Sequence, residues 1–413
     1  MRDLLLRNAP LRNLWLGQTI SYMGDSIYNI ALMWFVFVET GSSVLVGLIF
    51  VAGFLPEVLF GMLLGAIVDR FNRKLLMQLS DLFRALLLGA LALLFAFDWF
   101  AIWQLYVITI GLSLSNLLFG MARGAMLPDL VGSDHLIQAN SLFSSSRQVT
   151  RLLGSAVGGV LVAWMGATGS ITINAVTFLI SLVFIQLIPN LKLFDAPAEA
   201  SARKSIFADV GEGFRWILNF RVLLLLIVIG TLSNIALGPT NVLPAMYIKE
   251  DLQQNAEALG IFDAAIAIGL LAGGLFVGAV APKRIGLWFT AGLATEGVGM
   301  LLVSIAPNLL VACIGNVVLG LGVMVSSIPL GTMIQTMTPS GMRGRVNSLS
   351  SLGFSMAIPI TYGGVGWLAE VIGAKASYAA GGGLLFLCVL LGIVAMRGKH
   401  VDLNHLSTKQ VAQ

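Results

Sequence analysis

Twelve apolar runs of membrane-spanning length constrain the fold of this chain more than any other feature. A helix that crosses a bilayer needs about 20 mostly apolar residues. Such runs lie near residues 11–38, 44–68, 75–97, 102–126, 141–164, 170–189, 220–247, 258–281, 286–306, 309–335, 346–369 and 374–396. Only 11% of the 413 residues are charged, less than half the share of about 25% in soluble domains. The sequence therefore predicts an all-α integral membrane protein with twelve transmembrane helices.

The basic residues predict the orientation of these helices. Cytoplasmic loops of membrane proteins are enriched in Lys and Arg. If both termini are cytoplasmic, only Lys249 and Lys375 of the 24 basic residues fall in outer loops or at outer helix ends. The cations form short clusters between apolar runs, so we expect contact with the lipid bilayer and no nucleic-acid partner. The prediction is a multi-pass protein of the plasma (inner) membrane with both ends inside.

One long polar segment divides the chain in two. It runs from Pro189 to Phe220 and contains the small and charged stretch PAEASARKS. We therefore predict an N-terminal six-helix bundle over residues 1–189 and a C-terminal six-helix bundle over 220–396. A cytoplasmic linker, 190–219, joins them, and residues 397–413 form a cytoplasmic tail.

The two halves also repeat one another. Asn140-Ser141-Leu142 matches Asn347-Ser348-Leu349, and Gly166-Ala167 matches Gly373-Ala374 at the same spacing of 26 residues. A second match joins GAIVDRFNRK, from Gly65, to GAVAPKRIG, from Gly278. The offsets of 207 and 213 residues are about half the chain. Two six-helix repeats in parallel orientation are therefore expected, related by an axis along the membrane normal.

The loop after the second span carries the motif of a known family. GAIVDRFNRK resembles the loop signature of the major facilitator superfamily, Gly-x-x-x-Asp-Arg-x-Gly-Arg-Arg/Lys, at Gly65, Asp69, Arg70, Arg73 and Lys74. Asn72 replaces a glycine, and we expect it to tolerate a left-handed turn. A positively charged inner loop would explain the three cations but not Asp69. The resemblance implies that Asp69 meets the start of the eleventh span and an arginine of the fourth, with Arg123 as candidate, and so latches the cytoplasmic side.

Further segments narrow the resemblance to a branch. WLGQTISYMGDSIYNIALMWFV, FLPEVLFG, DLFRA, LPDLV and RGRVNSLSSLGFSMAIP occur in the order typical of drug exporters that include macrolide-efflux and enterobactin-export proteins. The resemblance covers essentially the whole chain. It implies a secondary-active exporter with alternating access. The Gly-Pro pair of some antiporter branches is absent from LLGSAVGGV in the fifth span, so their antiport mechanism does not transfer directly.

Four carboxylates lie well inside spans, namely Asp25, Glu57, Asp263 and Glu296. Burial of an ionised carboxylate without a partner is costly, so such residues are candidates for substrate or proton binding. Asp25 shares a helix face with Gln18, Ser21, Tyr22, Tyr28 and Asn29, a polar stripe expected to face a cavity or another helix, either as a functional site or as packing. Glu57 lies among Gly and Phe, and apolar surroundings disfavour the charged form, which suits proton coupling.

The remaining charged and amide residues carry weaker expectations. Glu296 is equally compatible with helix packing and with function, and Asp263 is a candidate for an outer gate or an interface. Asp81 and Arg84, at i and i+3 on one helix face, can neutralise one another or join the network of Asp69, and we expect a structural ion pair near the cytoplasmic side. The helices expected to line a central cavity also contribute Asn116, Asn234 and Asn241.

The leading function is export of amphipathic or cationic drug-like molecules in exchange for protons by a monomeric transporter. The alternatives are a dedicated exporter of one metabolite, such as a siderophore or lipid, and a non-coupled facilitator or transporter-like sensor. No P-loop occurs, and the three histidines lie outside the spans. We expect no enzyme activity, cofactor or metal ion.

Overall fold

The computed structural model describes residues 5, 8–132, 135–189, 220–280, 282, 284–338 and 343–396. Within these ranges the regular structure is helical throughout, and no strand is present. The predicted linker, 190–219, and the predicted tail, 397–413, lie outside the described residues. The predicted all-α class is confirmed.

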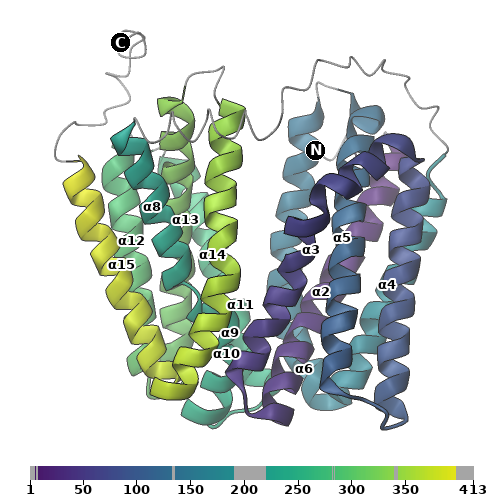
Figure 1. The fold of residues 1–413 in the computed structure, drawn as a ribbon, viewed down its shortest axis with the longest axis horizontal. Helices are drawn as coiled ribbons and strands as arrows, with labels where there is room; N and C mark the ends of the chain where they lie inside the picture. Colours follow the sequence, from purple (N-terminus) through teal and green to yellow (C-terminus); the bar gives the residue numbers. More distant parts are fainter. Residues whose placement is uncertain are drawn as a thin grey trace. The chain divides into compact units, whose positions relative to one another are not determined.

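Contacts between helices divide the chain into two compact units. Unit 1 comprises Met1–Ala196 with Gln253–Ala264, and unit 2 comprises Pro197–Leu252 with Ala265–Gln413. The helices of unit 1 are α2 (Ala9–Thr40), α3 (Ser43–Arg70), α4 (Arg73–Ala96), α5 (Ile102–Val131) and α6 (Leu136–Gln186), drawn from purple to teal in Figure 1. The first turns of α11 (Ala256–Val280) also belong to unit 1.

Unit 2 contains the rest of α11 and a second set of helices. They are α8 (Arg221–Ala236), the short α9 (Pro239–Val242) and α10 (Pro244–Met246), the π-helical η2 (Tyr247–Asp251), α12 (Ile285–Ile305), α13 (Leu309–Met337), α14 (Arg343–Ile372) and α15 (Ala374–Met396). The predicted seventh span, 220–247, is therefore broken after Ala236. Pro239 and Pro244 each begin a new short helix. Proline is favoured at the first helical position, because a backbone N–H there has no partner within the helix.

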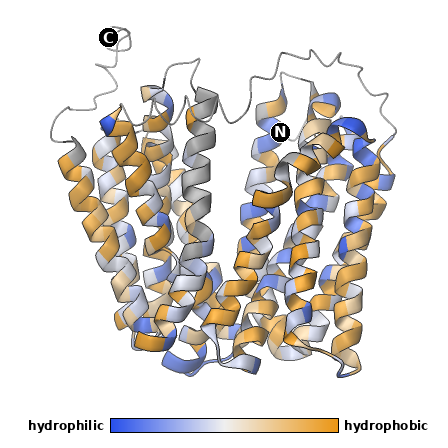
Figure 2. Ribbon diagram, viewed as in Figure 1, coloured by the Kyte–Doolittle hydropathy of each residue, from blue (hydrophilic) through white to orange (hydrophobic). Residues whose placement is uncertain are grey.

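The number of membrane-length helices agrees with the prediction of twelve spans. Nine helices of the described part are long and apolar enough to cross a bilayer. One of them, within α6, contains the predicted fifth and sixth spans, separated at Gly166, where the backbone is left-handed (φ 68°). Helices α2 and α14 are not among the nine. With these two helices added, and α6 counted as two spans, the number is twelve. Figure 2 shows apolar residues along most of the length of the helices.

Two glycines support the internal repeat. Gly166 and its sequence match Gly373 both adopt positive φ, 68° and 85°. An L-residue with a Cβ is strained in that region, so glycine is needed at both turns. The repeated Gly-Ala pairs therefore mark the same backbone turn in the two halves of the sequence.

The prediction for Asn72 is wrong in its mechanism. Asn72 has φ −60° and ψ 116°, which is extended and not left-handed. It is the N-cap of α4, and its side-chain oxygen accepts a hydrogen bond from the backbone N–H of Leu75 at 3.2 Å. An asparagine cap satisfies one of the free N–H groups at a helix start. This turn therefore selects a capping side chain where the family signature has glycine.

Close helix approaches position the polar residues of both units. In unit 1, α2 packs along α6, and a Cβ at Gly24 would collide with the side chains of Thr177 and Asn174. In unit 2, α12 packs along α13, and a Cβ at Gly322 would stand 2.5 Å from the backbone nitrogen of Glu296. Gly24 thus lets α2 bring Asp25 close to α6, and Gly322 lets α13 approach α12 at Glu296.

Candidate functional site: carboxylates within the helical bundles

Asp25 forms a hydrogen-bonded chain between α2 and α6. The Nδ2 group of Asn174 donates to Oδ1 of Asp25 at 3.3 Å. The hydroxyl of Thr177 donates to Oδ1 of Asn174 at 3.0 Å. The backbone carbonyl of Asn174 is a second acceptor for this hydroxyl, at 2.8 Å, so Thr177 contacts both polar oxygens of Asn174. The half-buried carboxylate is therefore held by a donor that is itself held in place.

Positive charge compensates Asp25 without a direct ion pair. Arg84 and Arg147 are close enough to attract its carboxylate. Arg84 makes its own ion pair with Asp81, as predicted from their spacing, and both side chains are buried. The guanidinium also lies 4.3 Å from the ring centre of Phe178 and contacts Asn116 at 3.5 Å. The interior of unit 1 therefore carries two carboxylates with a buried, well-packed arginine close to both.

Arg123 contacts the N-terminal part of the predicted polar stripe on α2. Its Nη1 donates to Oε1 of Gln18 at 3.1 Å and to the hydroxyl of Tyr22 at 2.5 Å. Its guanidinium lies 5.0 Å from the ring centre of Phe143. The predicted partner, Asp69, is exposed at the end of α3. In this conformation Arg123 therefore joins α5 to α2, and not to the loop signature.

The loop signature makes contacts within unit 1. Arg73 donates to the carboxylate of Asp129 at 2.7 Å and to the carbonyl of Ala125 at 2.9 Å. Lys74 donates to the carbonyls of Gln186 and Ile188 at 3.1 and 2.6 Å, at the end of α6. Arg70 and Asp69 are exposed, and a Cβ at Gly65 would meet no atom within 4 Å. Two of the five signature residues thus fix the start of α4 to α5 and α6.

The structure does not give Glu57 the buried environment that the sequence suggested. Its side chain is exposed on α3, whereas the preceding Pro56 is buried. The neighbouring Leu55, Val58 and Leu59 are also exposed, with fractions of 43%, 53% and 61%. In the part of the chain that the structure describes, the glycines and phenylalanines on its own face leave the carboxylate exposed.

Asp263 binds α6 from the first turns of α11, all within unit 1. The hydroxyl of Ser155 donates to Oδ2 of Asp263 at 2.5 Å, and the guanidinium of Arg151 lies 3.9 Å from Oδ1. The helices touch closely beside this pair, since a Cβ at Gly159 would stand 2.7 Å from the carbonyl oxygen of Ala256. Asp263 is thus a helix-to-helix contact, one of the two roles expected of it.

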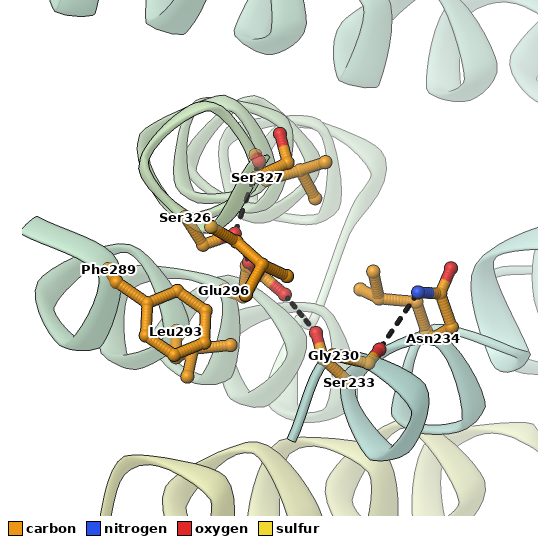
Figure 3. Close-up of a pocket in the computed structure, with 11 residues that line it drawn as sticks. Gly230, Ser233, Asn234, Phe289, Leu293, Glu296, Ser326 and Ser327 are labelled. Atoms are coloured by element: carbon orange, nitrogen blue, oxygen red, sulfur yellow. Dashed lines mark hydrogen bonds between the residues drawn. The ribbon is translucent and has the colours of Figure 1, made fainter. Parts of the chain in front are cut away.

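Glu296 is the most enclosed of the four carboxylates, with 1% of its surface exposed. It lies on α12 between α8 and α13, where the hydroxyl of Ser233 donates to Oε2 at 3.2 Å and the hydroxyl of Ser326 donates to Oε1. Figure 3 shows these three side chains converging beside a cavity of about 100 Å³. Asn234 and Ser327 also line the cavity. A buried acid with two hydroxyl partners and space beside it can hold and exchange a proton.

The other predicted amides are dispersed. Asn29 and Asn116 are exposed on α2 and α5. Asn234 donates to the carbonyl of Gly230 at 2.9 Å beside the Glu296 cavity, and Asn241 donates to the hydroxyl of Thr240 at 3.3 Å. Asn116 contacts Arg84, and Asn234 lies beside Glu296.

The structure adds residues that the sequence reading missed. They are the partners of the predicted carboxylates and cations, namely Asn174, Asp129, Arg147, Arg151, Ser155, Ser233 and Ser326. The two arginines could have been found, because they lie at i and i+4 inside a predicted span, where charge is rare. The serines could not, since one hydroxyl in an apolar helix commonly bonds its own backbone and carries no signal.

Comparison with known proteins identifies relatives along the whole chain. A family model described as "Transmembrane secretion effector" matches residues 5–412. Macrolide efflux protein A of Streptococcus pyogenes is 25% identical over 353 residues, covering 84% of this chain and 86% of that protein. The enterobactin exporter EntS of Escherichia coli is 26% identical over 410 residues, covering 96% and 94%. The crystal structure of a bacterial homologue of the iron transporter ferroportin superposes with a TM-score of 0.71 at 18% identity, covering 94% and 98%.

Proposed function

Since the chain belongs to the transmembrane secretion effector family of the major facilitator superfamily, we propose that it exports amphipathic or cationic drug-like molecules in exchange for protons. It is a multi-pass membrane transporter, and its relatives include efflux proteins. The proposal includes the cargo, the proton as coupling ion and the outward direction of transport. It also includes a monomeric transporter with both termini in the cytoplasm.

The observation that carries the proposal is the Asp25 network. A half-buried carboxylate in a membrane helix, held by Asn174 and flanked by two arginines, is available to either of two positive ligands. A proton neutralises it, and a cationic group on a substrate pairs with it. Because both ligands use the same carboxylate, binding of one disfavours the other. That competition is what exchange of a proton for a cationic substrate requires.

Alternating access supplies the movement in this proposal. Residues 1–189 and 220–396 rock as two bundles, and the contact made by Asp69 at the cytoplasmic side opens and closes. A carboxylate is favourable at the positive end of a helix, so an exposed Asp69 is suited to meet a helix N-terminus in one state and lose it in the other. Arg73 and Lys74 support this role indirectly, because they hold the beginning of α4 in place.

A dedicated exporter of one acidic metabolite is the second candidate. Arg147 and Arg151 are exposed on the same face of α6 within a predicted span. An exposed guanidinium in that setting can receive a carboxylate or phenolate of a substrate. EntS, a relative at 26% identity, is an enterobactin exporter. This candidate predicts that anionic compounds compete with one another for transport and that cationic drugs do not.

Transport by inverted membrane vesicles tests the proposal. We expect uptake of a cationic amphipathic dye to rise when the vesicle interior is acidified, and to stop when the gradient is collapsed. Asp25→Asn should abolish the gradient-driven part. Asp98→Asn, which neutralises an exposed carboxylate outside the helices, should behave as wild type. Uptake that ignores the gradient would favour a facilitator, and uptake of anions alone would favour the second candidate.

A further inference from the structure

Glu296 is buried without any cation to balance its charge. Among the described residues no Lys or Arg lies within ion-pair distance of it, and its recorded partners are the hydroxyls of Ser233 and Ser326. The helices packed around it, α8, α13 and α15, present one titratable group to it in the part of the chain described, the buried thiol of Cys388. An ionised carboxylate in this place would be uncompensated, which is costly in an apolar interior.

Close backbone contacts hold α12 at Glu296 against α13. Helix α13 contacts α12 at Gly322, beside the backbone of Glu296, and a Cβ at Gly292 would collide with the backbone of Ser326. Both contacts belong to the close approach of α13 to α12, one helical turn apart along α12. The backbone of α12 at Glu296 is therefore fixed against α13, so a change of charge on the carboxyl group has to be met by the hydroxyls and the cavity beside it.

The serine hydroxyls form a network that suits a neutral acid. The hydroxyl of Ser326 has a second acceptor within reach, the carbonyl of Val323 at 3.1 Å. If Glu296 carries a proton, its O–H group donates to Ser326, Ser326 donates to Val323, and Ser233 donates to the other carboxyl oxygen. Each of the three polar hydrogens then has an acceptor. If the proton is lost, Ser326 turns its hydrogen from Val323 to Glu296.

We propose that Glu296, Ser233 and Ser326 form a proton-binding site within unit 2, separate from Asp25. Its cavity of about 100 Å³ has room for about three waters at roughly 30 Å³ each. A proton passes from the carboxyl group to water in this cavity, the O–H bond of Glu296 breaks, and the hydroxyl of Ser326 reorients. The cavity is lined largely by apolar residues, among them Phe289 and Leu293.

Infrared difference spectroscopy of the purified protein tests the site directly. At neutral pH we expect a carbonyl stretching band of a protonated carboxyl group that is lost in Glu296→Gln. The band should shift in Ser326→Ala, because the acceptor of the acid hydrogen is removed, and remain unchanged in Ser327→Ala. Glu39→Gln, at an exposed glutamate at the end of α2, should also leave it unchanged. Absence of the Glu296 band would overturn the proposal. A band that appears only when sodium ions are withdrawn would also overturn it, because the site would then bind sodium.

Transport then separates this inference from the proposed function, on which its role in coupling rests. We expect Glu296→Gln to lose dye accumulation driven by a pH gradient and to keep exchange of labelled for unlabelled dye. If Glu296→Gln accumulates as much dye as wild type, with the same pH dependence, this site has no role in coupling, and the proposed antiport is unaffected. If the wild-type protein itself ignores the gradient while the infrared band is present, the antiport proposal fails and the proton site stands.

Discussion

Arg73 and Asp129 join the start of α4 to the last turn of α5 through a hydrogen-bonded ion pair of 2.7 Å. Arg73 belongs to the loop signature, whereas Asp129 lies in the LPDLV segment of α5, 56 residues later. The carbonyl of Ala125 accepts a hydrogen bond from the same guanidinium nitrogen at 2.9 Å. Part of the signature therefore acts within unit 1, and among its residues Asp69 and Arg70 stay exposed.

A double-mutant cycle measures this pair. Arg73→Ala and Asp129→Ala should show a coupling energy of about 0.2–1 kcal/mol, since the pair is only partly buried. Arg73→Ala alone should cost more than Asp129→Ala, because it also removes the bond to Ala125. Unfolding in detergent supplies the free energies. Arg70→Ala, at an exposed neighbour, should combine additively with Asp129→Ala, and strict additivity for Arg73 as well would contradict the pair.

The buried pair of Asp81 and Arg84 should respond much more strongly. Replacement of one partner leaves the other buried and uncompensated, which costs about 3–5 kcal/mol. We expect Arg84→Leu to lower the thermal midpoint sharply and Asp81→Leu/Arg84→Leu to recover much of the loss. The aromatic contacts of Arg84 with Phe119 and Phe178 limit the recovery. A double variant no more stable than Arg84→Leu would indicate that these rings, and not the ion pair, require the arginine.

The sequence predicted the helices well because membrane-length apolar runs are a local signal. It also predicted the Asp81–Arg84 pair, since the partners are one turn apart on one helix. It favoured Glu57 for proton coupling and left Glu296 open between helix packing and function, whereas in the structure Glu57 is exposed and Glu296 is buried. Burial depends on the neighbouring helices, and nothing in the α12 sequence indicates that Ser233 of α8 and Ser326 of α13 meet there. Asn72 was misread because a cap and a left-handed turn favour the same residue type.

Gly260 tests the packing of α11 on α6. A Cβ there would collide with the carbonyl oxygen of Ser155 and stand 2.8 Å from the Cα of Gly159. Gly260→Val should therefore destabilise the protein by about 1–3 kcal/mol, the usual cost of overpacking. Gly274 lies in the same helix with no atom within 4 Å of an added Cβ. Gly274→Val is the matched control, and equal losses in both variants would show that helix propensity, and not the contact, is responsible.

Asp251, outside the spanning helices, should give a measurable pH effect. Partial burial raises the pKa of its carboxyl group, and the ammonium of Lys375 opposes this rise. A raised pKa in the folded state means that the contribution to stability is complete below the unfolded value of about 3.9 and is lost as the pH rises through the folded value. Asp251→Asn removes this loss, because the amide does not ionise. The thermal midpoint of the variant minus that of wild type should therefore increase from acidic to neutral pH. A difference that does not change with pH would contradict the burial effect.

A graded series at Asp25 should distinguish a binding carboxylate from a packing one. Asp25→Asn removes the charge, Asn174→Ala removes the donor, and Thr177→Val removes the hydroxyl that orients Asn174. A hydrogen bond to a charged group contributes about 1.5–3 kcal/mol, and 1.4 kcal/mol is tenfold in affinity. We therefore expect Asp25→Asn to weaken binding of a cationic dye at least about tenfold, with Thr177→Val the mildest of the three. Calorimetric titration of purified variants measures this, and a neutral analogue of the dye should lose little. If both ligands lose affinity equally, Asp25 holds α2 on α6 and does not recognise charge.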